Sequence, residues 1–228
     1  MYSGESISRS LNFIRYARRR AHTALGNTKA VSISTMKKIA VLIDGGYLRV
    51  ITRAQNRAYT AALVERIALR IPAADEELYR ILYYDCDEYS GTQKLPVSGT
   101  PKTFTPKSTL LSDLAKRDLF AVRRGVLKFR GFKPRAVPVP PTTPTDADFK
   151  PDFEQKGVDM RIGLDIALFS QTKAVDRIIL ITNDTDTIPA MKYGRRSGIQ
   201  IVLVEMVGAH LTSELLGHSD FIRPITWT

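Results

Sequence analysis

The fold is decided by one stretch, RIILITNDTD at Arg177–Asp186. Its apolar, mostly β-branched residues are typical of a strand buried on both faces in the middle of a parallel sheet. The strand runs into small polar residues and two acids, Asp184 and Asp186. A second stretch repeats this arrangement, because residues 38–43 lead directly into Asp44. Ligands bind beyond the carboxyl ends of parallel strands, so we expect these acids at a functional edge.

Strands and helices alternate on both sides of this stretch. Thr60 is expected to cap a helix that reaches about Ile71 and ends at Pro72. Residues 78–84 and 199–204 read as further buried strands. This alternation predicts one α/β domain with a central, mostly parallel sheet.

Two segments are expected to interrupt the regular pattern. Residues 86–107 are rich in Ser, Thr, Gly, Pro and Lys, which indicates a surface loop. The prolines of residues 133–152 predict an extended, poorly ordered insertion within the domain. Between them, residues 126–132 alternate apolar and basic side chains, as in a half-exposed strand with one basic face.

Composition excludes several classes of protein. The chain has 228 residues, 43% of them hydrophobic, which is ordinary for a globular domain with a core. Cys86 is the single cysteine, so an intramolecular disulfide and a multi-cysteine zinc site are both excluded, and a cytoplasmic location is expected. No apolar run approaches the ~20 residues that span a bilayer, so no membrane association is expected. The sequence leaves open whether the protein forms a homo-oligomer.

The chain is strongly basic, with a net charge of +11. A basic domain that concentrates aspartates at strand ends indicates a polyanionic partner held near a bound cation. A charge that serves only solubility is the alternative, and charge by itself does not decide between them.

Residues 1–36 form a basic N-terminal extension, in which residues 5–25 can make an amphipathic helix with an arginine-rich face. Three interpretations are open: an arm for nucleic acid or another acidic surface, an organelle transit peptide, or an over-extended reading frame. Because Met36 directly precedes the first strand, we expect that the natural start is there and that residues 37–228 are the functional domain.

Four acids are expected to meet at the carboxyl edge of the sheet: Asp44, Asp159, Asp184 and Asp186. They come from two strand ends and the first turn of a helix near residues 156–168. Ionised carboxylates this close together repel one another unless a cation is present, and oxygen ligands select Mg²⁺ or Mn²⁺ rather than zinc. Such a site can orient a water and neutralise charge on a phosphodiester. Each acid alone could instead cap a helix or turn.

Three neighbouring residues are secondary candidates. Thr182 and Asn183 stand beside Asp184 and are candidates to support it. Asp165 lies well around the helix from Asp159, where it either supports the ligands or pairs with Arg161, four residues earlier.

These motifs together resemble the NYN domain, a family of the PIN-like nuclease superfamily, and the chain is most similar to its LabA-like bacterial branch. The resemblance covers about residues 37–226 and rests on IDGGYL at 43–48, KGVD at 156–159 and TNDTD at 182–186. It implies a PIN-like three-layer α/β/α fold and a metal-dependent ribonuclease whose acids correspond to Asp44, Asp159, Asp184 and Asp186. Many members carry Asn where this chain has Tyr47.

Basic and aromatic residues near these motifs are candidates for binding RNA. Tyr47 either stacks on a base beside the cation or is a half-buried core tyrosine. The candidates for phosphate contacts are Arg123, Arg124, Lys128, Arg130 and Lys156.

The expected function is therefore cleavage of RNA phosphodiester bonds by a Mg²⁺- or Mn²⁺-dependent endoribonuclease. A non-catalytic module of the same fold that binds RNA or a protein is one alternative. A Mg²⁺-dependent phosphatase or nucleotide hydrolase is another, although the chain has no Walker-type glycine-rich phosphate loop.

Overall fold

The computed structural model describes residues 36–137 and 143–227. The chain divides into residues 1–34 and residues 35–228, and the unit described below is the second. The expectations for the N-terminal extension lie outside the described residues. Within the described residues, no helix is long and apolar enough to cross a membrane.

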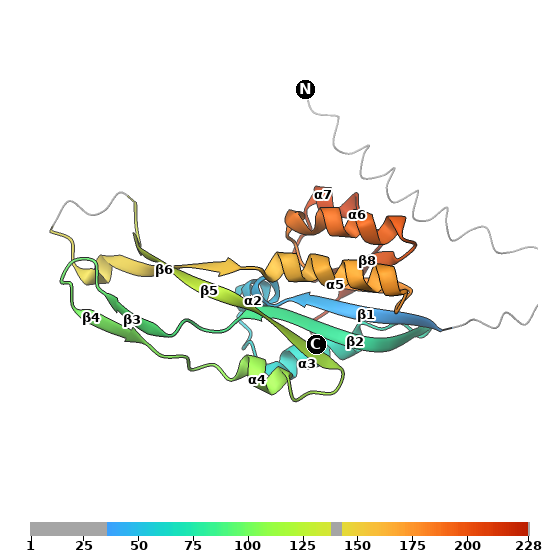
Figure 1. Cartoon of the computed structure of the whole chain (residues 1–228), viewed down its shortest axis with the longest axis horizontal. Coiled ribbons are helices and arrows are strands. Elements are labelled where there is room, and N and C mark those ends of the chain that lie inside the picture. Colours follow the sequence, from blue (N-terminus) through green and yellow to red (C-terminus); the bar gives the residue numbers. More distant parts are fainter. Residues whose placement is uncertain (1–35, 138–142, 228) are drawn as a thin grey trace, which may run out of the picture. The chain divides into compact units, whose positions relative to one another are not determined.

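A seven-stranded sheet organises the domain, in the order β6-β5-β2-β1-β7-β8-β9 (Figure 1). Every neighbouring pair is parallel except β5 and β6. The expected α/β fold with a mostly parallel sheet is confirmed. The strands are β1 (Lys37–Asp44), β2 (Glu76–Cys86), β5 (Phe120–Pro134), β6 (Phe149–Lys156), β7 (Arg177–Ile181), β8 (Gln200–Met206) and β9 (Phe221–Ile225).

Helices cover both faces of this sheet and give three layers. One face carries α2 (Gly45–Ala54), α3 (Ala61–Arg70) and α4 (Leu110–Leu114). The other carries α5 (Val158–Thr172), α6 (Ile188–Arg196) and α7 (Ser213–Leu216). The strands are buried between these layers, which explains why β1 and β7 are apolar at successive positions rather than at alternate ones.

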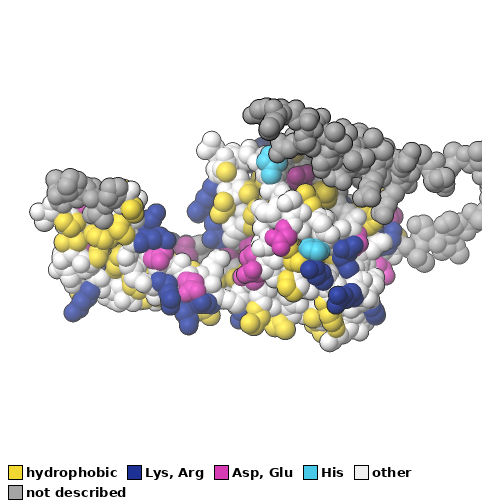
Figure 2. Space-filling model, turned by 90° about the horizontal axis from the view of Figure 1, so that it is seen from above, with side chains coloured by type: hydrophobic (Ala, Val, Ile, Leu, Met, Phe, Trp, Pro, Cys, Tyr) yellow, Lys and Arg dark blue, Asp and Glu magenta, His cyan; other side chains and the backbone are white. Residues whose placement is uncertain are grey.

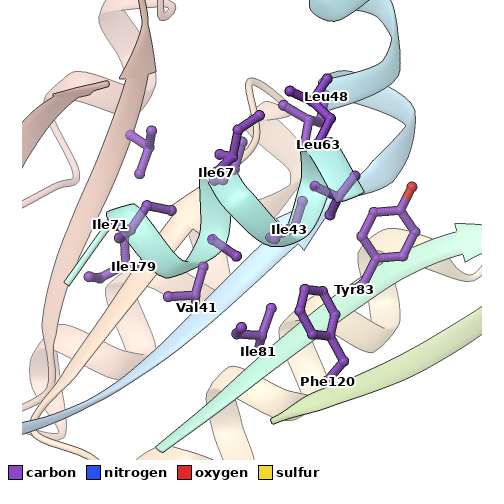
Figure 3. Packing of buried hydrophobic residues seen from close by; sticks show 14 of the residues in the cluster. Val41, Ile43, Leu48, Leu63, Ile67, Ile71, Ile81, Tyr83, Phe120 and Ile179 are labelled. Carbon is purple, nitrogen blue, oxygen red and sulfur yellow. The ribbon is translucent and has the colours of Figure 1, made fainter. Parts of the chain in front are cut away.

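Helix α3 shows how the sequence pattern produces the packing. The Thr60 side chain accepts a hydrogen bond from the Leu63 amide at 3.2 Å, so the expected cap is confirmed. Leu63, Ile67 and Ile71 then recur at helical spacing and point at the sheet (Figure 3). They pack against Val41 and its neighbours in the central strands.

The expected loop at residues 86–107 is wrong in part. Two short strands, β3 (Gly91–Lys94) and β4 (Pro101–Phe104), pair antiparallel within it. The Ser, Thr and Gly content suits a hairpin turn as well as an irregular loop, so composition did not distinguish them.

The prediction of a poorly ordered insertion at residues 133–152 is also wrong for both ends of this range. Strand β5 continues to Pro134 and pairs with β6 from Phe149, and a 3₁₀ turn at Asp146–Asp148 precedes β6. Prolines are tolerated because these strands lie at the sheet edge, where some amides need no partner. Residues 138–142 lie outside the described part.

Together these strands form an arm that extends beyond the sheet, defined here as residues 89–104, 126–134 and 149–156 (Figure 1). Strand β5 pairs with β2 only as far as Gly125, opposite Cys86, so the arm projects past the carboxyl edge of β2. Aromatic rings with centroids 5.2–6.1 Å apart hold its hairpins together. The rings belong to Tyr89, Phe104, Phe129, Phe132 and Phe153.

A buried charge network closes the opposite, amino edge of the sheet. Glu76 accepts hydrogen bonds from Arg177 and, at 2.8 and 2.9 Å, from Arg223, and the Ala73 amide donates to it at 2.7 Å. Burial alone would raise the pKa of Glu76, but the hydrogen bonds outweigh it and lower the pKa to about 2. This network joins the beginnings of β2 and β7 to β9.

Glu76→Gln is expected to lower the free energy of unfolding by about 3–5 kcal/mol at pH 7, because it leaves the buried guanidinium of Arg177 and the partly buried one of Arg223 without their charge partner. The folded-state pKa of Glu76 is lowered to about 2. Its contribution is therefore full above about pH 4.5 and is lost as the pH falls through about 2. Urea unfolding measured across this pH range should show that the difference in free energy of unfolding between Glu76→Gln and wild type becomes smaller as the pH falls. Glu77→Gln, on the same strand but exposed, is the matched control.

Phe129→Ala is expected to loosen the arm while leaving the sheet intact, because the Phe129 ring contacts other arm rings. Hydrogen exchange should accelerate at residues 91–104 and 126–134 with little change in β1 or β7. Lys128→Ala, one residue earlier with an exposed side chain, should change neither. Equal acceleration throughout the sheet would instead mean that arm and sheet unfold as one unit.

Candidate metal-binding site at the carboxyl edge

Asp44 ends β1 and begins the site. One of its oxygens accepts a hydrogen bond from the Tyr47 amide at 3.0 Å, which caps α2, and the other accepts one from the Thr182 hydroxyl at 3.3 Å. Gly45 permits α2 to begin this close to β2, because a Cβ there would lie 2.4 Å from the Tyr83 hydroxyl oxygen. The carboxylate is buried and its orientation is set by both neighbours.

Asp184 follows β7 and is tied to Asp44 through one hydroxyl group. The Asp184 amide donates to Thr182 Oγ1 at 3.1 Å, while the same Thr182 hydroxyl donates to Asp44. Asp184 Oδ1 in turn accepts from the Asp186 amide at 2.9 Å. The buried Thr182 therefore supports both acids, and Asp186 lies on the exposed side of the turn. Asn183 accepts from the Thr212 amide at 2.8 Å and fastens the loop at residues 208–212 beside them.

Asp159 approaches from the other helical layer. It lies in the first turn of α5, two residues after Gly157, whose φ of +76° turns the chain from β6 into the helix. The helix dipole favours a carboxylate in this turn.

The pKa values show that these acids interact. Burial raises the pKa of Asp44, the Tyr47 amide and Thr182 hydroxyl oppose this, and the charges of Asp159 and Asp184 raise it further. Burial likewise raises the pKa of Asp159, with additional contributions from the charges of Asp184 and Asp186. The fold thus brings all four predicted acids into one region where they repel one another.

The chemistry of this donor set fits a hard divalent cation. Carboxylate oxygens are the ligands that Mg²⁺ and Mn²⁺ prefer, and a cation would relieve the repulsion that raises both pKa values. Among the residues that the structure describes, however, no three His, Cys, Asp or Glu side chains are arranged to hold a metal ion. The acids form an electrostatically coupled cluster that is not yet a set of three metal ligands.

Asp165 makes a different contact from the one expected. The pairing with Arg161 is wrong, because the Arg161 guanidinium donates to the Gly157 carbonyl at 2.7 Å. The buried Asp165 instead accepts from the Tyr84 hydroxyl at 2.8 Å and from Arg123 at 3.0 and 3.3 Å. Sequence spacing could not reveal this, since the partners lie on β2 and β5. The pair joins α5 to the sheet.

The other basic candidates also have acidic partners. Arg124 pairs with Asp87 at 2.6 Å, and Arg130 pairs with Glu154 at 3.2 Å. Lys156 also pairs with Glu154. All of these are exposed pairs, which are worth little and exchange readily for other anions. Lys128 is exposed on the arm.

The sequence did not single out Asp85, although it also lies at a strand end. Its buried carboxylate pairs with Arg49 of α2 and accepts from Gln155 of β6 at 3.2 Å and from Tyr83 at 3.2 Å. Gln155 also lies near Asp44. A Cβ built on Gly46 would be 3.2 Å from the side-chain oxygen of Gln155 and 3.3 Å from Asp44 Oδ1. Asp85 could have been predicted from the sequence, because it too is an acid at the end of a strand. Nothing in the sequence pattern indicated that Gln155, a residue of the arm, would contact it.

Comparisons with known proteins bear on the fold. No protein-family model and no curated protein matches the chain. A crystal structure of a protein of unknown function from Vibrio parahaemolyticus is similar, with a TM-score of 0.50 and 16% identity. The match covers 88% of this chain and 96% of that one. At this identity the similarity concerns the fold alone.

Addition of Mn²⁺ at about 100 times its Kd is expected to raise the melting temperature of wild type by about 5–10 °C. Asp184→Asn should abolish the rise, because one ligand charge is lost, while the amide oxygen can still accept from Asp186. Without metal the variant should melt at or above wild type, since repulsion on Asp44 and Asp159 is removed. Asp118→Asn, at an exposed position, is the control.

The pH dependence provides a second check on the same cluster. The folded-state pKa values of Asp44 and Asp159 are raised, so their contribution to metal-free stability is present at low pH and is lost as the pH rises through those values. The cation effect should show the opposite trend, since protons compete with Mn²⁺. A Mn²⁺ shift that is independent of both pH and Asp184 would place the cation elsewhere.

Proposed function

We propose that this chain is a Mg²⁺- or Mn²⁺-dependent endoribonuclease of the PIN-like, NYN type. The observation that supports it most is the electrostatic coupling of Asp44, Asp159 and Asp184, which come from two strand ends and one helix start. Burying like charges together is costly, so such a cluster is expected where a cation is to be bound.

In this proposal Asp44, Asp159 and Asp184 hold the cation, with Asp186 at its exposed side. The bound cation would supply charge neutralisation at the phosphodiester and a water of lowered pKa. The Thr182 hydroxyl keeps Asp44 and Asp184 oriented through its two hydrogen bonds. The Tyr47 amide holds the other oxygen of Asp44, so the buried ligand is fixed before substrate arrives.

A polyanionic strand fits the surroundings of the acids. A cavity of about 520 Å³ opens at Asp44, Asp184, Thr185 and their neighbours. Acidic side chains gather near the middle of the face in Figure 2, and Lys and Arg side chains lie both towards the arm and at the other end of the body. We assign phosphate contacts to Arg123, Arg124, Lys128, Arg130 and Lys156, and at the exposed pairs of Arg124, Arg130 and Lys156 a phosphate would replace the acidic partner.

One observation favours a second function, a non-catalytic module that binds RNA or a protein. Within residues 36–137 and 143–227, the acids are not arranged as a ready set of three metal ligands. For such a module, binding would persist without divalent cations. The single thiol of Cys86 is compatible with a cytoplasmic setting for either function.

Purified wild type with Mn²⁺ is expected to cut internal bonds in a mixed panel of single-stranded and structured RNAs. Asp44→Asn should reduce cleavage by about 100-fold or more, because it removes a ligand charge, while the melting temperature measured without metal and the RNA affinity stay near wild type. The side-chain oxygen of the introduced asparagine can still cap α2. Asp118→Asn should cleave as wild type does. Mn²⁺-independent binding with no cleavage of any RNA or DNA would favour the non-catalytic module.

A further inference from the structure

A second cavity adjoins the acidic one and is not used by the proposed chemistry. It has a volume of about 170 Å³ and lies between α2 and the turn after β8. Its lining comprises Tyr47, Ile51, Ala54, Gln55, Asn183, Gly208, Ala209, His210 and Trp227. The two cavities share Tyr47 and Asn183 in their linings, so they lie next to each other.

The chemistry of this lining differs from that of the acidic cavity. None of its side chains is a carboxylate, lysine or arginine, which makes the cavity unsuited to a phosphate. Instead it offers the rings of Tyr47 and Trp227, the aliphatic Ile51 and the amide of Gln55. A flat, uncharged ring with polar edges is the complementary ligand.

The Tyr47 hydroxyl is a second, independent sign of a ligand. It is buried, and it has no hydrogen-bond partner among the described residues. A buried hydroxyl without a partner is costly, and a ligand acceptor that it meets after a rotation of the Tyr47 side chain would remove that cost.

The rest of the wall is already held in place. Trp227 donates its indole N–H to the Val207 carbonyl at 2.6 Å, and Arg57 lies over its ring. The Asn183 amide fastens the loop through the Thr212 amide and the His210 carbonyl, at 2.8 and 3.4 Å. The cavity is therefore shaped before a ligand enters, which lowers the entropy that binding must overcome.

We propose that this cavity binds one unpaired nucleobase of the RNA, next to the phosphate at the acidic cluster. The proposal rests on the ribonuclease function above and adds a base preference at one position flanking the cut. Tyr47 contributes to both cavities, its amide orienting Asp44 and its side chain bounding the base site. A base must be unstacked to enter, so single-stranded segments are the expected substrate class.

The test begins with nucleosides, which carry no phosphate, and without any metal. Saturation-transfer NMR on the full chain should show transfer to the base protons of at least one nucleoside and little to free ribose. Ala54→Trp places a large ring in the cavity from an exposed helix position and should weaken binding about tenfold or more, the scale of one stacked base. Ala58→Trp, four residues further and outside the lining, should bind as wild type does.

Cleavage then separates this inference from the function on which it rests. With Mn²⁺, wild type should cut beside a preferred nucleotide, and Ala54→Trp should cut with that preference flattened, while Ala58→Trp keeps it. Nucleoside binding that is lost in Ala54→Trp, together with an absence of any cleavage, would support the base site and remove the ribonuclease proposal. Cleavage without nucleoside binding, and with a site preference that Ala54→Trp leaves unchanged, would overturn the base site and leave the ribonuclease proposal standing.

Discussion

Parallel pairing places the ends of neighbouring strands at one edge of a sheet, and the rest of this structure depends on that constraint. Strands β1 and β7 lie side by side, with Ile43 opposite Ile181, so the residues that follow them must emerge together. Asp44 and Asp184 are consequently close enough to raise the pKa of Asp44. One hydroxyl, that of Thr182, can then contact both acids.

The buried acids at the two edges of the sheet have opposite electrostatic surroundings. At the amino edge, Glu76 has two guanidinium partners and a lowered pKa, so its charge is satisfied within the fold. At the carboxyl edge, the pKa values of Asp44 and Asp159 are raised, and the charged groups next to them are other aspartates. The first arrangement stabilises the folded chain by itself, and the second gains most from a cation that the chain does not supply.

The arm extends from the carboxyl edge of the sheet. Because β5 continues past its pairing with β2, it carries β6 and its basic residues outward from the end of the sheet that holds the acids. Strand β6 then returns to the body, brings Gln155 beside Asp85 and leads through Gly157 into Asp159. Strand β6 and the start of α5 thus form one continuous segment that runs from the aromatic cluster of the arm to the acids of the sheet edge.

Local pattern in the sequence determined the α/β class, the buried strands β1 and β7 and the Thr60 cap, because each depends on residues close together in the chain. Tertiary structure alone decided the pairing of Asp165 with Arg123, the network around Asp85 and the arm built from apparently irregular segments. Asp165 and Arg123 are 42 positions apart and Asp85 and Gln155 are 70 apart, separations at which helical and strand periodicity no longer indicates which side chains meet.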